Sequence, residues 1–104
     1  MKVELTPQAE RHVLAIDTWW QQNREHARDL FLEELALALE SLVSVPLTGR
    51  LCPIPGVRGT RRILLRNSRY HVYYLVARDN VTVVAVWSAV RVVLLRAPTL
   101  LSSL

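Results

Sequence analysis

The first quarter of the chain changes from a strand pattern to a helical pattern. Residues 2–5 alternate polar and apolar side chains, which predicts a short strand. Thr6 and Pro7 then supply a hydroxyl N-cap and a proline at the first helical position. The helix expected from there has one apolar face, which consists of Ala9, Val13, Ile16 and Trp20.

A second helix is expected over residues 26–45, after a polar turn over residues 21–25. Its apolar stripe consists of Phe31, Leu35, Ala38 and Leu42. Two consecutive helices joined by a short polar segment predict an antiparallel helix hairpin. The next segment, 46–59, holds all three glycines and three of the five prolines, which predicts a loop.

After Gly59 the period of the apolar positions changes to two. Strands are expected at 61–66, 69–77 and 81–87, with tight turns at Asn67-Ser68 and Asp79-Asn80. These strands predict an antiparallel meander. The whole chain, 1–104, is therefore expected to be a single α+β domain of βααβββ order, with an antiparallel sheet packed against an N-terminal helix hairpin. The apolar tail at 92–95 fits either an extension of the last strand or a short helix.

Composition narrows the class of protein. A chain of 104 residues with 51% hydrophobic residues is long enough for one domain and too short for two. No apolar run approaches the roughly 18 residues of a membrane-spanning helix, and the N-terminus lacks the apolar core of a secretory signal. The single cysteine, Cys52, cannot form an intramolecular disulfide and is treated as incidental. A reducing compartment, the cytoplasm, is expected.

Charge is divided unevenly along the sequence. Residues 1–49 hold four basic and eight acidic side chains, which gives −4, whereas residues 50–104 hold nine arginines against Asp79 alone, which gives +8. Arginine binds phosphate and carboxylate groups in a bidentate manner. The basic half is compatible with an anionic partner, either nucleic acid or an acidic protein segment, and equally with a solvated sheet face.

The stretch RRILLRNSRYHVYYLV, followed by VTVVAVWSAVR, resembles the RelE/ParE family of bacterial toxins. These are the toxic halves of type II toxin–antitoxin pairs, and the resemblance covers about residues 2–91. It implies a cognate antitoxin partner that is acidic, is partly disordered when free and joins the toxin in a hetero-oligomer. RelE-like members cut mRNA in the ribosomal A site. ParE-like members keep the fold without the nuclease residues and poison DNA gyrase.

The nuclease residues that the resemblance carries over are incomplete. Arg62, His71 and Arg91 fall where RelE-like nucleases have functional residues. Leu64 and Ser88 replace a basic residue and a histidine at two further positions, and no tyrosine follows Arg91. We therefore expect a ParE-like toxin that inhibits gyrase or another target without cutting RNA. The alternatives are a RelE-like mRNA endonuclease and a degenerate, non-toxic binding module, the latter suggested by the altered tail after Arg91.

The candidate catalytic residues have roles that the chemistry of RNA cleavage defines. Arg62 and Arg91 would stabilise the charge on the phosphate, and His71 would act as base or acid because its unperturbed pKa lies near 6.5. Strand alternation places His71 and Tyr73 on one face of the sheet, opposite Tyr70 and Tyr74. An ordinary sheet histidine without a catalytic role fits the same pattern.

A second set of residues is assigned to binding of the target or the antitoxin. Its members are Arg61, Arg66, Arg69, Tyr70, Tyr73 and Trp87. Trp20 fits the core stripe of the first helix, which leaves Trp19 for a contact surface, and Tyr74 is expected to pack inside. No metal site or cofactor is expected, because His12, His26 and His71 are scattered along the sequence.

Overall fold

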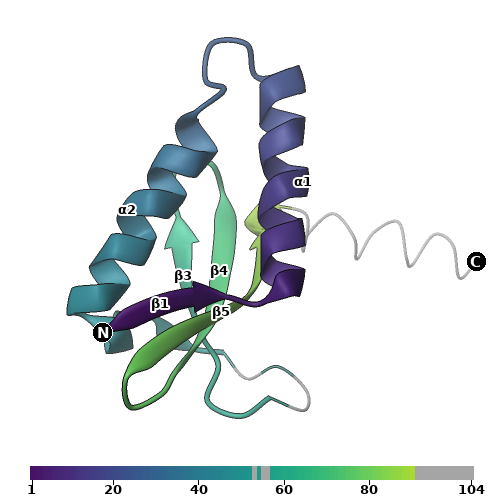
Figure 1. Cartoon of the computed structure of the whole chain (residues 1–104). Coiled ribbons are helices and arrows are strands. Elements are labelled where there is room, and N and C mark those ends of the chain that lie inside the picture. The colour runs from purple at the N-terminus through teal and green to yellow at the C-terminus, as the bar shows by residue number, and fades with distance from the viewer. Residues whose placement is uncertain (53, 55–56, 91–104) are drawn as a thin grey trace, which may run out of the picture.

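The computed structural model describes residues 1–52, 54 and 57–90, and it has the expected α+β architecture. The elements are β1 (Lys2–Leu5), α1 (Pro7–Asn23), α2 (Leu30–Ser44), the 3₁₀ helix η1 (Pro46–Thr48), β2 (Arg50–Leu51), β3 (Arg61–Leu65), β4 (Tyr70–Val76) and β5 (Asn80–Ser88). Both helices lie on the same side of the sheet and spread apart from the loop that connects them (Figure 1). The predictions made for Arg91 and for the tail at 92–95 lie outside the described residues.

The sheet has five strands in the order β1-β5-β4-β3-β2. The expected antiparallel meander of β3, β4 and β5 is confirmed. The expectation of a purely antiparallel sheet is wrong, because β1 pairs in parallel with β5, from Lys2↔Asn80 to Leu5↔Val83. A parallel pair requires a long crossover connection, and here the two helices and the first strands of the meander provide it. The sheet is therefore mixed, with β5 between β1 and β4.

Local signals place the start of α1 correctly. The Thr6 side chain accepts a hydrogen bond from the Ala9 amide at 3.1 Å, and Pro7 occupies the first helical turn. α2 begins four residues later than expected, at Leu30, because the chain first makes successive turns. In these turns Ala27 N donates to Arg24 O at 3.0 Å and Leu30 N donates to Ala27 O at 3.2 Å.

The segment expected as a loop, 46–59, contains η1 and β2. β2 pairs with β3 through Arg50↔Arg62 and Leu51↔Arg61, and Cys52 N donates to Thr60 O at 2.8 Å. The prediction of an irregular loop is thus wrong for its first residues. A two-residue strand has no periodicity of its own, and only pairing with β3 defines it.

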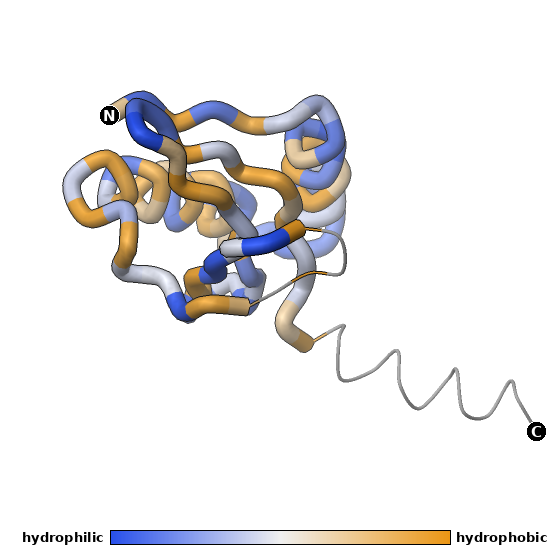
Figure 2. Tube along the Cα trace, turned by 90° about the horizontal axis from the view of Figure 1, so that it is seen from below, coloured by the Kyte–Doolittle hydropathy of each residue, from blue (hydrophilic) through white to orange (hydrophobic). Residues whose placement is uncertain are grey.

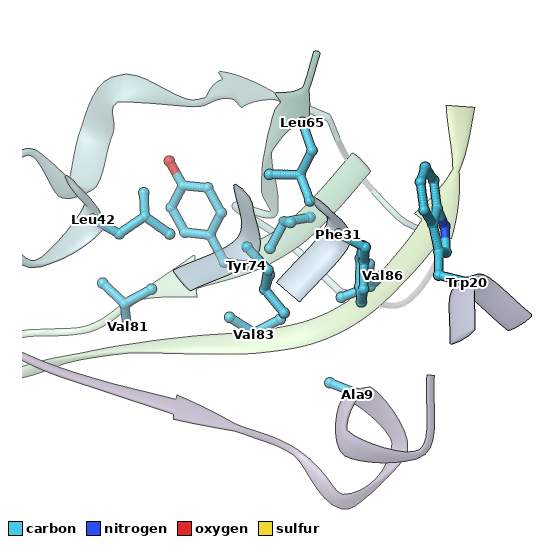
Figure 3. Packing of buried hydrophobic residues seen from close by; sticks show 11 residues of the cluster. Ala9, Trp20, Phe31, Leu42, Leu65, Tyr74, Val81, Val83 and Val86 are labelled. Atoms are coloured by element: carbon cyan, nitrogen blue, oxygen red, sulfur yellow. The ribbon is translucent and has the colours of Figure 1, made fainter. Parts of the chain in front are cut away.

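The hydrophobic core lies between the helices and the sheet. Its buried members are Ala9, Trp20, Phe31, Leu35, Leu42, Leu65, Val72, Tyr74, Val81, Val83 and Val86. Trp20 lies at one end of this cluster, and Tyr74 lies toward the other, beside Leu42 (Figure 3). The expected burial of Trp20 and Tyr74 is confirmed.

Hydrophilic and hydrophobic residues are interspersed along the chain, as the tube in Figure 2 shows. In α1 and α2 the buried side chains recur at helical spacing, namely Ala9 and Trp20 in α1 and Phe31, Leu35 and Leu42 in α2. This pattern is typical of amphipathic helices that pack on one side only. Within residues 1–52, 54 and 57–90, no helix combines the length and the apolar character that a membrane crossing needs.

Candidate functional site

The sheet surface that faces away from the core collects several of the candidate residues. Directly opposed pairs across the strands are Arg50↔Arg62, Arg62↔Tyr73, Leu64↔His71 and His71↔Trp87. Opposed residues point to the same face of a sheet, and residues two apart along a strand also share a face. We call this surface the open face, and its members are Arg50, Arg62, Leu64, His71, Tyr73 and Trp87.

Aromatic rings form a continuous row across the open face. The ring centroids of His71 and Tyr73 are 6.0 Å apart, and those of Tyr73 and Trp87 are 4.8 Å apart. The side chain of Tyr73 is almost fully buried, at 4% exposure, whereas Trp87 is 41% exposed. Tyr73 therefore supports the indole ring of Trp87, which presents an aromatic surface to solvent.

Arg62 and His71 are neighbours, although the sequence alone did not fix the strand register. Burial and the nearby Arg62 guanidinium lower the pKa of His71 below its usual value of 6.5. The imidazole is therefore neutral at pH 7. Its Nδ1 atom is buried and has no hydrogen-bond partner in the described part of the chain. Chemically, this pair offers one permanent cation beside one neutral imidazole that can accept a proton.

His12 joins this region from α1, which no sequence pattern indicated. Its ring lies 6.2 Å from that of Trp87. β1 covers β5 only as far as Val83, and His12 Nδ1 accepts a hydrogen bond from the Val86 amide at 3.2 Å, beyond the end of β1. Burial and the neighbouring Arg11 lower the pKa of His12, which keeps this nitrogen unprotonated and able to accept.

Two residues assigned to binding do not lie on the open face. Tyr70 packs on the core side, where its hydroxyl accepts a hydrogen bond from Trp20 Nε1 at 2.9 Å. Arg61 donates to the carbonyl oxygens of Gly49 and Leu47 at 2.7 and 3.3 Å and so holds the segment before β2. Both side chains have structural partners that their positions in the sequence did not reveal.

The remaining candidate residues are dispersed around the fold. Arg66 and Arg69 are exposed at the two ends of the β3–β4 turn. Trp19 is 44% exposed on α1, and the Arg24 guanidinium lies 5.4 Å from the centre of its ring. Trp19 is therefore exposed, and its place in a contact surface stays a prediction. In the described part of the chain, no three His, Cys, Asp or Glu side chains come together as metal ligands would.

Sequence reasoning also missed a contact that fixes the β3–β4 turn. The Glu34 carboxylate, on α2, accepts hydrogen bonds from the amides of Asn67 and Ser68, each at 2.8 Å, and from the Ser68 hydroxyl at 2.6 Å. Arg69, at the end of this turn, has a φ of 68°, a left-handed conformation that costs energy for a residue with a side chain. Glu34 therefore stabilises a turn that carries two exposed arginines.

We expect the Glu34→Gln variant to lower the free energy of unfolding at pH 7 by about 1–2 kcal/mol. Burial raises the pKa of Glu34, but the hydrogen bonds from Ser68 and Asn67 lower it more, and the net result is a lowered pKa. A group with a lowered pKa contributes stability above its unfolded value, about 4.3, and loses that contribution as the pH falls through the folded value. Urea denaturation at pH 7 and at pH 3 measures both effects.

The matched control for this prediction is Glu33→Gln. Glu33 is the exposed neighbour of Glu34, and its side chain makes no hydrogen bond in the described part of the chain. The difference between the Glu34→Gln variant and the parent chain should shrink toward pH 3, whereas Glu33→Gln should have little effect at either pH. An equal loss of stability at both pH values in Glu34→Gln would contradict the assignment.

A known protein family and two solved structures are similar to this chain. A family profile described as "ParE toxin of type II toxin-antitoxin system, parDE" matches residues 3–93. No curated protein sequence matches the chain. The fold is similar to a structure of the chromosomal ParDE TA system from P. aeruginosa, with a TM-score of 0.67, 16% sequence identity and coverage of 85% of this chain and 95% of that one.

A second solved structure has a similar fold. It is the intact RelBE toxin-antitoxin complex of E. coli, with a TM-score of 0.54, 21% identity and the same coverage of 85% and 95%. At these identities both structures support the fold alone. The family profile, which spans both helices and every strand from β1 onward, carries the assignment.

Proposed function

Since the chain belongs to the ParE toxin family of type II toxin–antitoxin systems, we propose that it inhibits DNA gyrase and that a cognate antitoxin neutralises it. The chain is a ParE-like toxin, and the match of the family profile over residues 3–93 is the observation that carries this statement. The gyrase target comes from the family that the chain resembles. The antitoxin partner is in keeping with the two similar structures, which are toxin–antitoxin systems.

The chemistry of the open face supports inhibition by binding over cleavage of RNA. Cleavage needs a base for the 2′-hydroxyl, an acid for the leaving oxygen and cations for the phosphate charge. Leu64, which is 45% exposed, places an apolar side chain directly opposite His71, where RelE-like nucleases carry a basic residue. His71 is neutral at pH 7 and adds no positive charge. Among the residues that the structure describes, RelE-like cleavage would have to rely on two neighbouring side chains, Arg62 and His71.

The surface of α2 supports a protein partner. Large apolar side chains are exposed on α2 and in the segment that follows it, namely Leu32, Leu37, Val43, Val45 and Leu47. Exposed apolar side chains that gather on one element are typical of protein–protein contacts. The net charge of +4 further favours an acidic antitoxin, as the charge asymmetry of the sequence indicates.

Induction of this chain in bacteria without an antitoxin tests the proposal. We expect growth arrest, with no new codon-spaced 5′ ends in primer extension on translated mRNA. His71→Gln should arrest growth as strongly as the parent chain, because inhibition by binding to gyrase needs no general base or acid at this position. Growth curves and primer extension on the same cultures provide both measurements.

Two other outcomes would point elsewhere. New 5′ ends that appear with the parent chain and disappear with a folded His71→Gln variant would indicate RelE-like cleavage. Continued growth in the presence of a folded, accumulating chain would indicate the degenerate binding module.

A further inference from the structure

The end of β5 extends beyond the strand that pairs with it at the edge of the sheet. β1 pairs with β5 as far as Val83, whereas β5 continues to Ser88. The amide of Val86 lies past the end of β1, and there His12 Nδ1 accepts its hydrogen bond at 3.2 Å. One side chain of α1 therefore supplies the acceptor that a neighbouring strand supplies elsewhere along β5.

This hydrogen bond requires a neutral imidazole. A ring nitrogen accepts only while it carries no proton, so His12 must hold its single ring proton on Nε2. A second proton, taken up from solvent, adds a hydrogen to Nδ1, which then faces the N–H of Val86, donor against donor. Val86 is 1% exposed, and a buried amide that loses its acceptor is costly until water reaches it. The closed arrangement is therefore favoured only while His12 is neutral.

The surroundings of His12 oppose its protonation. Burial and the positive charge of Arg11 lower the pKa of His12 below 6.5. From β5 the ring meets Val86 and Trp87, which do not titrate. The hydrogen bond is therefore present at pH 7 and is lost as the pH falls from about 6.5 through the lower folded value. The other titratable side chains on the adjoining strands are Lys2 and Glu4 of β1, which pair with each other at 3.1 Å, and Tyr73 and His71 of β4, which lie beyond Trp87.

We propose that His12 is a pH-sensitive latch that holds the end of β5 against α1. While the imidazole is neutral the latch is closed, and the Trp87 ring packs against the rings of both His12 and Tyr73. Addition of one proton to Nδ1 opens it, and β5 separates from α1 from Val86 onward. Because Trp87 belongs to the open face, this movement changes that surface at acidic pH. The latch goes beyond the proposed function and does not depend on it.

NMR spectroscopy of the ¹⁵N-labelled full chain between pH 7.5 and 4.5 tests the latch. At pH 7.5 we expect His12 to carry its proton on Nε2. Hydrogen exchange of the Val86 amide, corrected for the intrinsic rate at each pH, should become about 2- to 12-fold faster at pH 4.5, which is the loss of one net hydrogen bond. The Thr6 amide, which donates to Val83 O at 3.0 Å, should keep its protection as an internal control.

Replacements of His12 separate the latch from general destabilisation by acid. His12→Asn keeps an acceptor oxygen near the position of Nδ1 that no proton removes at these pH values, so the Val86 amide should stay protected throughout. His12→Ala removes the acceptor, and exchange should be fast at both ends of the range. His71→Gln and the exposed His26→Gln are the matched controls, and both should keep the pH dependence of the parent chain. Circular dichroism confirms that each variant is folded.

Three results would overturn the proposal. They are a Val86 amide that exchanges equally fast at both pH values in the parent chain, a His12 ring that carries its proton on Nδ1 at pH 7.5, and a pH dependence that persists in His12→Ala or disappears in His71→Gln. The parent chain and His12→Ala decide the result even where the shorter asparagine does not reach the amide. Gyrase and antitoxin are absent from these measurements, so their result is independent of the proposed function.

Discussion

Replacing Gly49 with alanine is expected to lower the free energy of unfolding by about 2–5 kcal/mol. An added Cβ would lie 2.8 Å from Tyr74 Cε1 and 2.9 Å from the Arg62 carbonyl oxygen, and it would also press against the Tyr74 hydroxyl. The Tyr74 ring is fully buried in the core and cannot swing away. Overpacking therefore adds to the loss of the hydrogen bond that Gly49 N donates to Tyr74 Oη at 2.8 Å.

This contact connects the core to the open face. Gly49 immediately precedes β2, and its carbonyl oxygen accepts the hydrogen bond from Arg61. Displacement of Gly49 would move Arg50 away from its position opposite Arg62. Domains of this size are stable by about 5–15 kcal/mol, so the substitution would remove a large part of that stability.

Urea denaturation of four variants measures the effect. Tyr74→Phe should cost about 1–3 kcal/mol, because it leaves the Gly49 amide without its acceptor. The double variant Gly49→Ala/Tyr74→Phe should cost less than the sum of the two single changes, because removal of the hydroxyl relieves one of the clashes. Gly59→Ala is the control, and it should cost about 1 kcal/mol from its φ of +76° alone, since no atom lies within 4 Å of its added Cβ. A Gly49→Ala variant no less stable than Gly59→Ala would contradict this account.

Features that depend on neighbours in the sequence were predictable. The cap at Thr6 and the apolar stripe that buries Trp20 arise within one helix, and their signals are local. The alternation of β4 placed His71 and Tyr73 on one face. The same alternation places Tyr70 on the core side, where its hydroxyl accepts a hydrogen bond from Trp20 Nε1. The assignment of Tyr70 to a binding surface did not take this face of the sheet into account.

Features that depend on distant pairing were not predictable. The parallel position of β1 beside β5 is set by contacts between the two ends of the described chain, such as Lys2↔Asn80. β2 is defined only by its pairing with β3 across the loop between them. The hydrogen bond between His12 and Val86 spans 74 positions, and those between Glu34 and the β3–β4 turn span 33 and 34. A histidine or glutamate on an amphipathic helix gives no signal that it caps a strand or a turn elsewhere.

The second large effect is expected on gyrase itself. The folded chain, in molar excess, should almost abolish the ATP-dependent supercoiling of a relaxed plasmid by purified bacterial gyrase. His71→Gln should leave this inhibition intact, because inhibition by binding to gyrase needs no general base or acid at this position. A type I topoisomerase that relaxes the same plasmid serves as the control for simple sequestration of DNA.

Supercoiling by gyrase in the presence of this chain is the most direct test of the proposal that this ParE-like toxin inhibits gyrase. We predict near-complete loss of supercoiling and unchanged relaxation by the type I enzyme. Supercoiling at the full rate, with the chain folded and in excess, would contradict it.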